Sequence, residues 1–319
     1  MKNPGLAVWT AALTLVVAAP AFAQEIIYQG QGQAVVTVLP KHEGEVPPSV
    51  ANQDLSVKVN GKNAKVTKWA PFAGDEAKVE LVLLIDGSAR SSLGRQMEEM
   101  AQFLKSLPPN TKAAVGYMDH GRALFVAPLS ADHTQVARQV HLPGGSPGSD
   151  SSPYFCLSDL AKNWPSKDSE ARREVVMVTD GVDNFQQGFD PSDPYVEAAI
   201  KDSVRAHLVV YSIYWKSQGR GDQLARGSFM GQSFLAEVSQ ATGGKAFYQG
   251  TENPVSFEPY FDELTRRLRN QYELRFSSVL GGKPGVEVFK LKLSAPGAEV
   301  DAPGEVLVMP AAPASAPGR

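Results

Sequence analysis

The sequence lacks three features that would define its class at once: paired cysteines, a basic surface and a long apolar run. Its 319 residues include one cysteine, Cys156, so no internal disulfide is possible. The formal net charge is −3, and no basic stripe with interleaved aromatic residues is present, so we expect no nucleic-acid partner. After residue 23, no apolar run approaches the roughly 20 residues of a membrane-spanning helix. With 43% hydrophobic and 20% charged residues, the chain is typical of a globular protein with a substantial core.

The amino terminus has the pattern of a secretory signal peptide. Lys2 supplies a short basic head, residues 6–19 are almost wholly apolar, and the Ala-Phe-Ala sequence of residues 21–23 fits a small-x-small cleavage site. We therefore expect residues 1–23 to be removed by cleavage after Ala23. The mature protein is then expected in the periplasm or outside the cell.

Two apolar runs that end in an aspartate organise the rest of the chain. Residues 79–86 (VELVLLID) and residues 174–180 (EVVMVTD) are each followed by a glycine. Runs of this kind, bounded by turn residues, predict strands that are buried on both faces, as in a parallel sheet. Because ligands bind outside the carboxyl ends of such strands, Asp86 and Asp180 predict a divalent-cation site or a polar binding face.

Strand and helix patterns alternate around these two runs. Further strands are expected at residues 112–118, 122–127, 207–215 and 245–248, and helices at residues 91–107, 131–140, 154–163, 193–205, 234–242 and 257–269. This order predicts an α/β fold over residues 77–270, with a doubly wound, mostly parallel, Rossmann-like sheet. Residues 143–152 are expected to form a glycine- and serine-rich loop, and residues 216–228 a polar, glycine-rich loop that is either functional or mobile.

The segments on either side of this unit alternate with the period of two that strands show. Residues 24–76 contain an Asn60-Gly61 pair between alternating runs, which is the strongest short hairpin signal. Residues 271–310 contain three more alternating runs. We expect the two segments to pair in one small β domain, into which the α/β domain is inserted. Residues 311–319, rich in alanine and proline, are expected to be disordered.

Several of these motifs together resemble a von Willebrand factor type A (VWFA) domain protein of the bacterial secreted type. They are the strand that ends in Asp86, the helix after it, the hairpin at residues 112–127, the Gly/Ser loop and the VTDGVDN turn at Asp180. The NQDLSVKVNGK sequence of residues 52–62 and the carboxyl-terminal strands are similar to the β segments that flank the domain in such proteins. The resemblance covers nearly all of the mature chain and implies a non-enzymatic module that binds a protein partner.

The resemblance also implies a metal-ion-dependent adhesion site. In that site an Asp-x-Ser-x-Ser turn, a threonine from a later loop and an aspartate at a later strand bind a small hard cation such as Mg²⁺, and an acidic residue of the partner fills the open position. Asp86 and Ser88 match the first two positions, and Asp180 matches the last. Ser151 is the candidate for the threonine position, with Ser149 and Ser152 as alternatives.

Arg90 occupies the third position of the turn, where the motif has a serine. An arginine removes one ligand oxygen and adds a permanent positive charge, which would repel a dication in a partly dry cleft by several kcal/mol. Its guanidinium can instead pair with Asp86 or Asp180 in the place of the metal. We therefore expect a degenerate site with weak or no metal and no other cofactor. Mg²⁺ would bind only if Arg90 turned outward to solvent.

Three classes of function stay open on the sequence alone. The first is an interaction module that binds its partner at the Asp86 and Asp180 edge, and the second is a scaffold that binds through the β domain. The third is a Mg²⁺-dependent phosphotransfer enzyme, which typically needs a second aspartate where this chain has Ser88. The chain has no G-x-S-x-G elbow and no histidines at metal-ligand spacing, and Cys156 is expected to be a small core residue, so we expect no catalytic residues.

Overall fold

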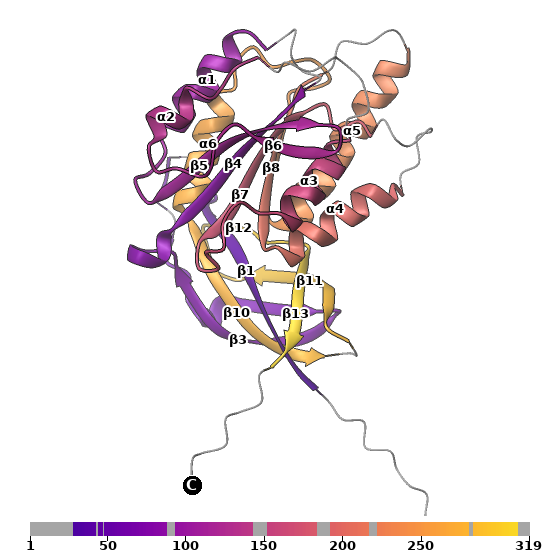
Figure 1. Ribbon diagram of the computed structural model, residues 1–319. Helices are drawn as coiled ribbons and strands as arrows, with labels where there is room; N and C mark the ends of the chain where they lie inside the picture. Colours follow the sequence, from indigo (N-terminus) through magenta and orange to yellow (C-terminus); the bar gives the residue numbers. More distant parts are fainter. Residues whose placement is uncertain are drawn as a thin grey trace, which may run out of the picture.

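The computed structural model describes residues 28–42, 44–46, 48–87, 93–142, 152–183, 192–216, 222–280 and 283–311. The predicted signal peptide at residues 1–23 lies outside the described residues, as does all but the first residue of the predicted tail. Two β-sheets account for the strands, and Figure 1 shows them as an upper sheet covered by helices and a lower sheet without them.

The upper sheet is mixed and has six strands in the order β6-β5-β4-β7-β8-β9. All neighbours are parallel except β6, which pairs antiparallel with β5 at one edge. Every residue of β4 and β8 is buried, as the apolar runs in the sequence predict for strands covered on both faces. The bounds are β4 (Val79–Asp86), β5 (Thr111–Asp119), β6 (Arg122–Phe125), β7 (Arg172–Thr179), β8 (Leu208–Tyr214) and β9 (Ala246–Phe247).

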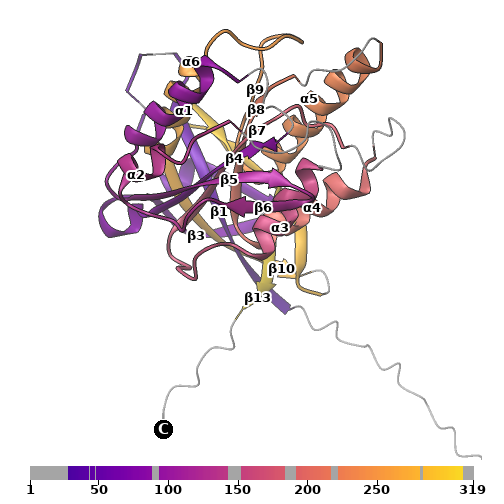
Figure 2. The ribbon, with the colours of Figure 1, turned by 45° about the horizontal axis from the view of Figure 1, so that its top comes forward.

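Helices cover both faces of this sheet (Figure 2). One face packs against α1 (Arg95–Lys105), α2 (His133–Ala137) and α6 (Glu258–Arg269), and the other against α3 (Pro153–Lys162), α4 (Pro194–Arg205) and α5 (Asp222–Thr242). The predicted helices are present with ends that differ by a few residues, except for α5. The prediction of a loop over residues 216–228 is wrong from Asp222 onward, where α5 begins. No helix within the described residues is long and apolar enough to cross a membrane.

The lower sheet is a closed antiparallel barrel. Its strands follow the order β10-β3-β2-β11-β13-β1, and β1 pairs with β10 over ten residues, from Tyr28 opposite Leu280 to Thr37 opposite Gln271. A seventh strand, β12, extends the sheet beside β1. The bounds are β1 (Tyr28–Pro40), β2 (Leu55–Val59), β3 (Lys62–Pro71), β10 (Gln271–Leu280), β11 (Gly285–Leu293), β12 (Ala298–Asp301) and β13 (Glu305–Pro310), with short 3-10 helices at Asn52–Asp54 and Gly74–Ala77.

The fold class predicted from the sequence is therefore wrong. The chain contains a closed six-stranded antiparallel barrel beside a mixed sheet, and it is not a clear doubly wound, Rossmann-like α/β fold with a small β domain attached. Closure depends on the pairing of β1 with β10, two strands from opposite ends of the chain, which no local pattern reveals. Gly32 contributes to it, because a Cβ at this position would lie 2.4 Å from the Phe276 ring inside the barrel.

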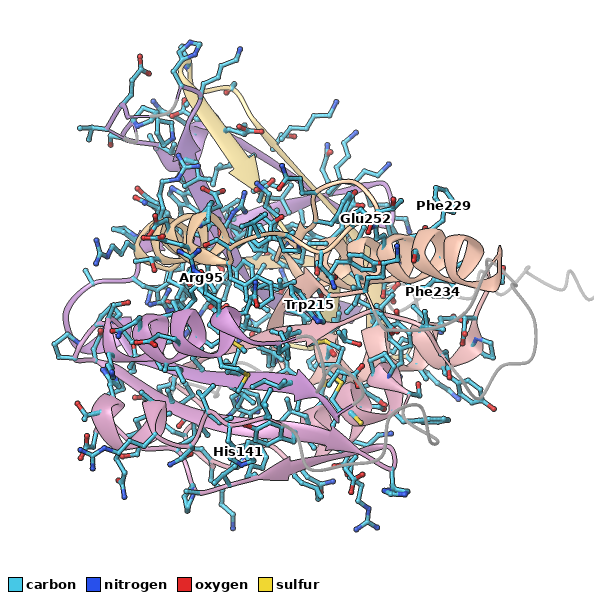
Figure 3. All side chains as sticks on the ribbon, turned by 90° about the horizontal axis from the view of Figure 1, so that it is seen from above. Arg95, His141, Trp215, Phe229, Phe234 and Glu252 are labelled. Carbon is cyan, nitrogen blue, oxygen red and sulfur yellow. The ribbon has the colours of Figure 1, made fainter. Side chains whose placement is uncertain are left out.

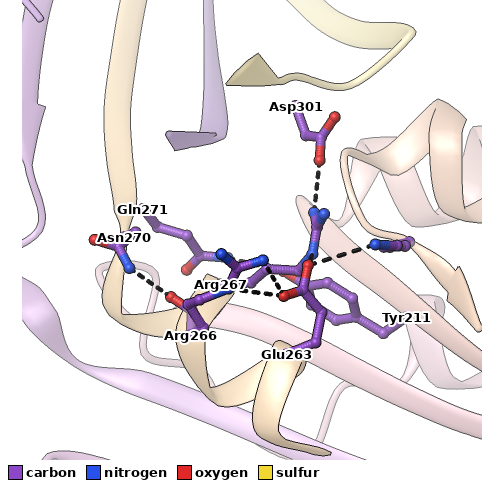
Figure 4. Close-up of polar contacts among 8 residues, drawn as sticks. Tyr211, Glu263, Arg266, Arg267, Asn270, Gln271 and Asp301 are labelled. Atoms are coloured by element: carbon purple, nitrogen blue, oxygen red, sulfur yellow. Dashed lines mark hydrogen bonds and ion pairs between the residues drawn. The ribbon is translucent and has the colours of Figure 1, made fainter. Parts of the chain in front are cut away.

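Buried polar contacts join the barrel to the upper sheet where α6 leads into β10 (Figure 4). The Arg267 side chain is only 4% exposed, and its guanidinium bonds Glu263 Oε1 at 2.8 Å and Asp301 Oδ2 of β12 at 2.7 Å. On the same junction, Gln271 Nε2 donates to the hydroxyl of Tyr211 at 3.2 Å. The Arg172 guanidinium at the start of β7 also donates to the Gln271 side chain of β10, so the barrel is fixed to the amino ends of the sheet strands and their carboxyl ends lie at the opposite side.

Candidate functional site

Asp86 and Asp180 lie at the same edge of the upper sheet. β4 and β7 are parallel neighbours, with Ile85 opposite Val178, so the residues that follow leave the sheet side by side. The two aspartates are nearly buried, at 2% and 9% exposure. Figure 3 views the molecule from above this edge, with Trp215 of the β8 end near the middle of the picture.

A threonine that the sequence analysis did not single out connects the two strand ends. Thr179 is fully buried, and its hydroxyl donates a hydrogen bond to Asp86 Oδ2 at 2.6 Å. The backbone N–H of Gly181 in turn donates to the Thr179 hydroxyl at 3.2 Å. The position of the Asp86 carboxylate is therefore set by β7 as well as by its own strand.

The turn after β7 is held by helix α5. Asp180 Oδ1 accepts the backbone N–H of Val182 at 2.9 Å, which is the local bond by which aspartate stabilises a turn. Gly181 has a φ of +70°, and a Cβ there would lie 2.6 Å from the carbonyl oxygen of Gly231 in α5. A Cβ at Gly231 would lie 2.0 Å from the carbonyl oxygen of Asp180. Both glycines are needed for this contact between the helix and the turn.

Further carboxyl groups surround a buried tyrosine next to the turn. The hydroxyl of Tyr154 in α3 donates to the carbonyl oxygen of Gly181 at 2.7 Å. Burial raises the pKa of Tyr154 well above its usual value, and the charges of Asp180, Asp183 and Asp193 raise it further. Asp183 and Asp193 are themselves buried, at 8% and 6% exposure. The edge is therefore acidic, and Tyr154 stays a neutral hydrogen-bond donor within it.

The one cysteine lies below the edge as a core residue, as the sequence predicts. Cys156 in α3 is fully buried and packs in the cluster formed by α3, α4 and α5 with the sheet. Burial, with a smaller contribution from the charge of Asp86, raises the pKa of the thiol to about 12. At neutral pH this group is a thiol and not the thiolate that acts as a nucleophile.

Four of the predicted metal-site residues cannot be compared with the geometry, because Ser88, Arg90, Ser149 and Ser151 lie outside the described residues. Ser152 is fully buried and caps α3, where its hydroxyl accepts the Phe155 N–H at 3.4 Å. Within the described part of the chain, no group of three His, Cys, Asp or Glu side chains is arranged to hold a metal ion.

Comparison with known proteins gives only distant similarities. No protein-family model matches the chain, and no curated protein matches it. A solved structure of an aerotolerance-related membrane protein from Bacteroides fragilis is 13% identical, with a TM-score of 0.43, and the match covers 60% of this chain and 98% of that one.

Two further solved structures match this chain over about half of their own length. Proximal thread matrix protein 1 from the mussel byssus, with a zinc-occupied MIDAS motif, is 14% identical with a TM-score of 0.44 and covers 66% of this chain and 50% of that one. The pilus adhesin SpaC from Lactobacillus rhamnosus GG is 11% identical with a TM-score of 0.43, and the match covers 86% of this chain and 49% of that one.

Proposed function

We propose that this protein is a secreted, VWFA-like interaction module that binds a protein partner at the edge formed by Asp86 and Asp180. The observation that carries the proposal is the convergence of these two carboxylates from neighbouring buried strands, with Thr179 fixing one of them.

The module is proposed to act without catalysis and with weak or no metal. The buried thiol of Cys156, with its pKa near 12, is unsuited to nucleophilic chemistry. Arg90 in the third motif position would compete with a dication for the two carboxylates. The signal-peptide pattern supports a periplasmic or secreted location.

A charge-neutralising variant tests whether the edge binds the partner. Asp180→Asn keeps the shape of the side chain and the oxygen that accepts the Val182 N–H, but it removes the charge. Asp262→Asn in α6 makes the same charge change at an exposed position and serves as the control. We expect the immobilised wild-type and Asp262→Asn proteins to retain the same protein from the periplasmic or culture fraction, and Asp180→Asn to retain about tenfold less. Equal retention by all three proteins would contradict binding at this edge and favour a binding surface on the barrel instead.

Metal dependence is tested by thermal unfolding in EDTA and in excess Mg²⁺ or Mn²⁺. A cation at about 100 times its dissociation constant stabilises the folded state by roughly 2.7 kcal/mol, which raises Tm by several degrees in a protein of this size. We expect no shift for the wild-type protein and a shift for Arg90→Ser, which restores the serine of the motif. A shift in the wild-type protein would contradict the proposal of weak or no metal, because it would show that the natural protein binds the cation.

A further inference from the structure

A cavity of about 550 Å³ lies between the barrel and the amino ends of the sheet strands. It is lined by the first residues of β7 and β8, by the end of α4 and by strands β1, β10 and β13 of the barrel. It therefore lies at the opposite end of the sheet from Asp86 and Asp180. Its volume falls within the roughly 300–1,000 Å³ of small-molecule sites, which are frequent where two structural units meet.

The wall of the cavity is partly apolar and partly cationic. Its apolar side chains include Val35, Phe72, Val204, Leu208 and Leu307. Five cationic side chains, Lys68, Lys78, Arg172, Arg173 and Arg275, face three glutamates, Glu170, Glu273 and Glu305. His207 adds no charge at neutral pH, because burial, together with the neighbouring Arg173, lowers its pKa from 6.5. The lining thus carries an excess of positive charge.

Two of the three glutamates, Glu273 and Glu170, are engaged by lysines and by one of the arginines. Glu273 is bonded both by Lys68, at 2.6 Å, and by Arg275. At the rim, Lys78 and Glu170 are 3.9 Å apart and largely exposed. Among the described residues, these pairs leave two arginines of the lining without an ion pair, Arg172 and Arg173.

Each of the two arginines donates to a backbone carbonyl group, and the Arg173 guanidinium also lies 5.6 Å from the centre of the Trp164 ring. Arg172 is 7% exposed, its Nη1 donates to the carbonyl oxygen of Leu268 at 3.2 Å, and its guanidinium lies 4.5 Å from the centre of the Phe72 ring. Arg173 Nη1 donates to the carbonyl oxygen of Ala206 at 3.3 Å. The other N–H groups of Arg173 have no acceptor within the described part of the chain. A guanidinium with open donors matches the two oxygens of a carboxylate.

We propose that this cavity binds a small amphipathic carboxylate, with Arg173 holding the carboxylate and the apolar wall enclosing the rest of the molecule. The excess of positive charge in the lining selects an anion, and the apolar side chains select one with a hydrocarbon body. Burial of this hydrocarbon contributes affinity in proportion to the apolar area removed from water. Neither feature depends on the edge at Asp86, so this site is separate from the proposed partner surface.

Decanoate is a suitable probe, because it combines a carboxylate with a hydrocarbon chain small enough for the cavity. Its binding to the full mature protein is measured by displacement of the fluorescent dye anilinonaphthalene sulfonate. We compare wild type with Arg173→Gln and with Ala206→Phe, which fills part of the lining and keeps every charge. Arg95→Gln in α1 is the matched control, since Arg95 is exposed, lies outside the lining and carries the same charge. Decanol tests whether the charge of the ligand matters.

We expect saturable binding of decanoate to the wild type and to Arg95→Gln, and about tenfold weaker binding to Arg173→Gln, because a charge-assisted hydrogen bond is lost. Decanol has no carboxylate to accept a charge-assisted hydrogen bond from Arg173, so it should bind the wild type at least about tenfold more weakly than decanoate. If Ala206→Phe does not fold, Arg173→Gln and decanol still decide the question. Absence of saturable decanoate binding, equal affinities of Arg173→Gln and Arg95→Gln, or equal affinities of decanol and decanoate would overturn the proposal.

Discussion

Glu174 should make the stability of this protein fall as the pH rises. The residue lies in β7 and is fully buried, and within the described residues neither carboxylate oxygen accepts a hydrogen bond of good geometry. Burial raises its pKa from 4.5 to about 7, although the charge of Arg172 and the amide of Gln271 act in the opposite direction. The folded protein therefore holds this proton more tightly than the unfolded chain does.

The sign and size of the effect follow from this difference in pKa. The proton on Glu174 contributes its full stabilisation below about 4.5, and this stabilisation is lost as the pH rises through about 7. A difference of this size between the folded and unfolded states corresponds to roughly 3 kcal/mol. Glu174→Gln has nearly the same shape and cannot ionise, so its free energy of unfolding lacks this dependence on pH.

Urea unfolding of wild type and Glu174→Gln at about pH 5 and about pH 8 measures the effect. Other titrating groups are common to both proteins and cancel in the difference between their free energies of unfolding. We expect the wild type to lose about 2–3 kcal/mol relative to Glu174→Gln between these two pH values, because part of the effect is already lost at pH 5. The exposed Glu258→Gln should show no such change. If the free energies of unfolding of the wild type and Glu174→Gln differ by the same amount at both pH values, the reasoning is refuted.

Two further predictions concern the strand ends and the core. Thr179→Val removes the hydroxyl that donates to the buried Asp86 carboxylate. Thermal unfolding should therefore show that this variant has a free energy of unfolding about 1–3 kcal/mol lower than the wild type. Thr179→Ser keeps the hydroxyl, so its free energy of unfolding should be much closer to that of the wild type. Destabilisation by Thr179→Ser as large as that by Thr179→Val would contradict a role for the hydroxyl. The thiol of Cys156 should not react with an aromatic disulfide reagent in the folded protein at neutral pH, and it should react fully in urea. The reaction is followed by the absorbance of the thiolate that the reagent releases.

The strands of the upper sheet could be predicted because they are apolar on both faces and end in turn residues. Helix α5 was missed in its first half because Gly227 and Gly231 each lower helix propensity by about 1 kcal/mol relative to alanine. The structure shows why a glycine stands at position 231, since any side chain there would meet the carbonyl oxygen of Asp180. A local signal against a helix was therefore a consequence of tertiary packing.

The barrel and part of the site could not be predicted, because both depend on contacts between distant segments. Alternation along residues 24–76 and 271–310 predicts strands, but it does not state that β1 and β10 close a barrel. Asp86 and Asp180 could be placed at one edge because parallel strands end together. Tyr154 could not be placed there, since its hydroxyl reaches Gly181 from a helix on the face of the sheet.

The same strand carries polar residues of both proposed sites, and its length keeps them apart. β7 begins with Arg172 and Arg173 at the cavity and is followed by Asp180 at the opposite edge. From Arg173 to Asp180 the strand rises by ~23 Å at about 3.3 Å per residue, and the six residues between are all buried. Variants so far apart with no shared contacts usually have independent effects. Asp180→Asn should therefore leave the decanoate affinity unchanged, and Arg173→Gln should leave partner retention unchanged; a change in either would show that β7 couples the two sites.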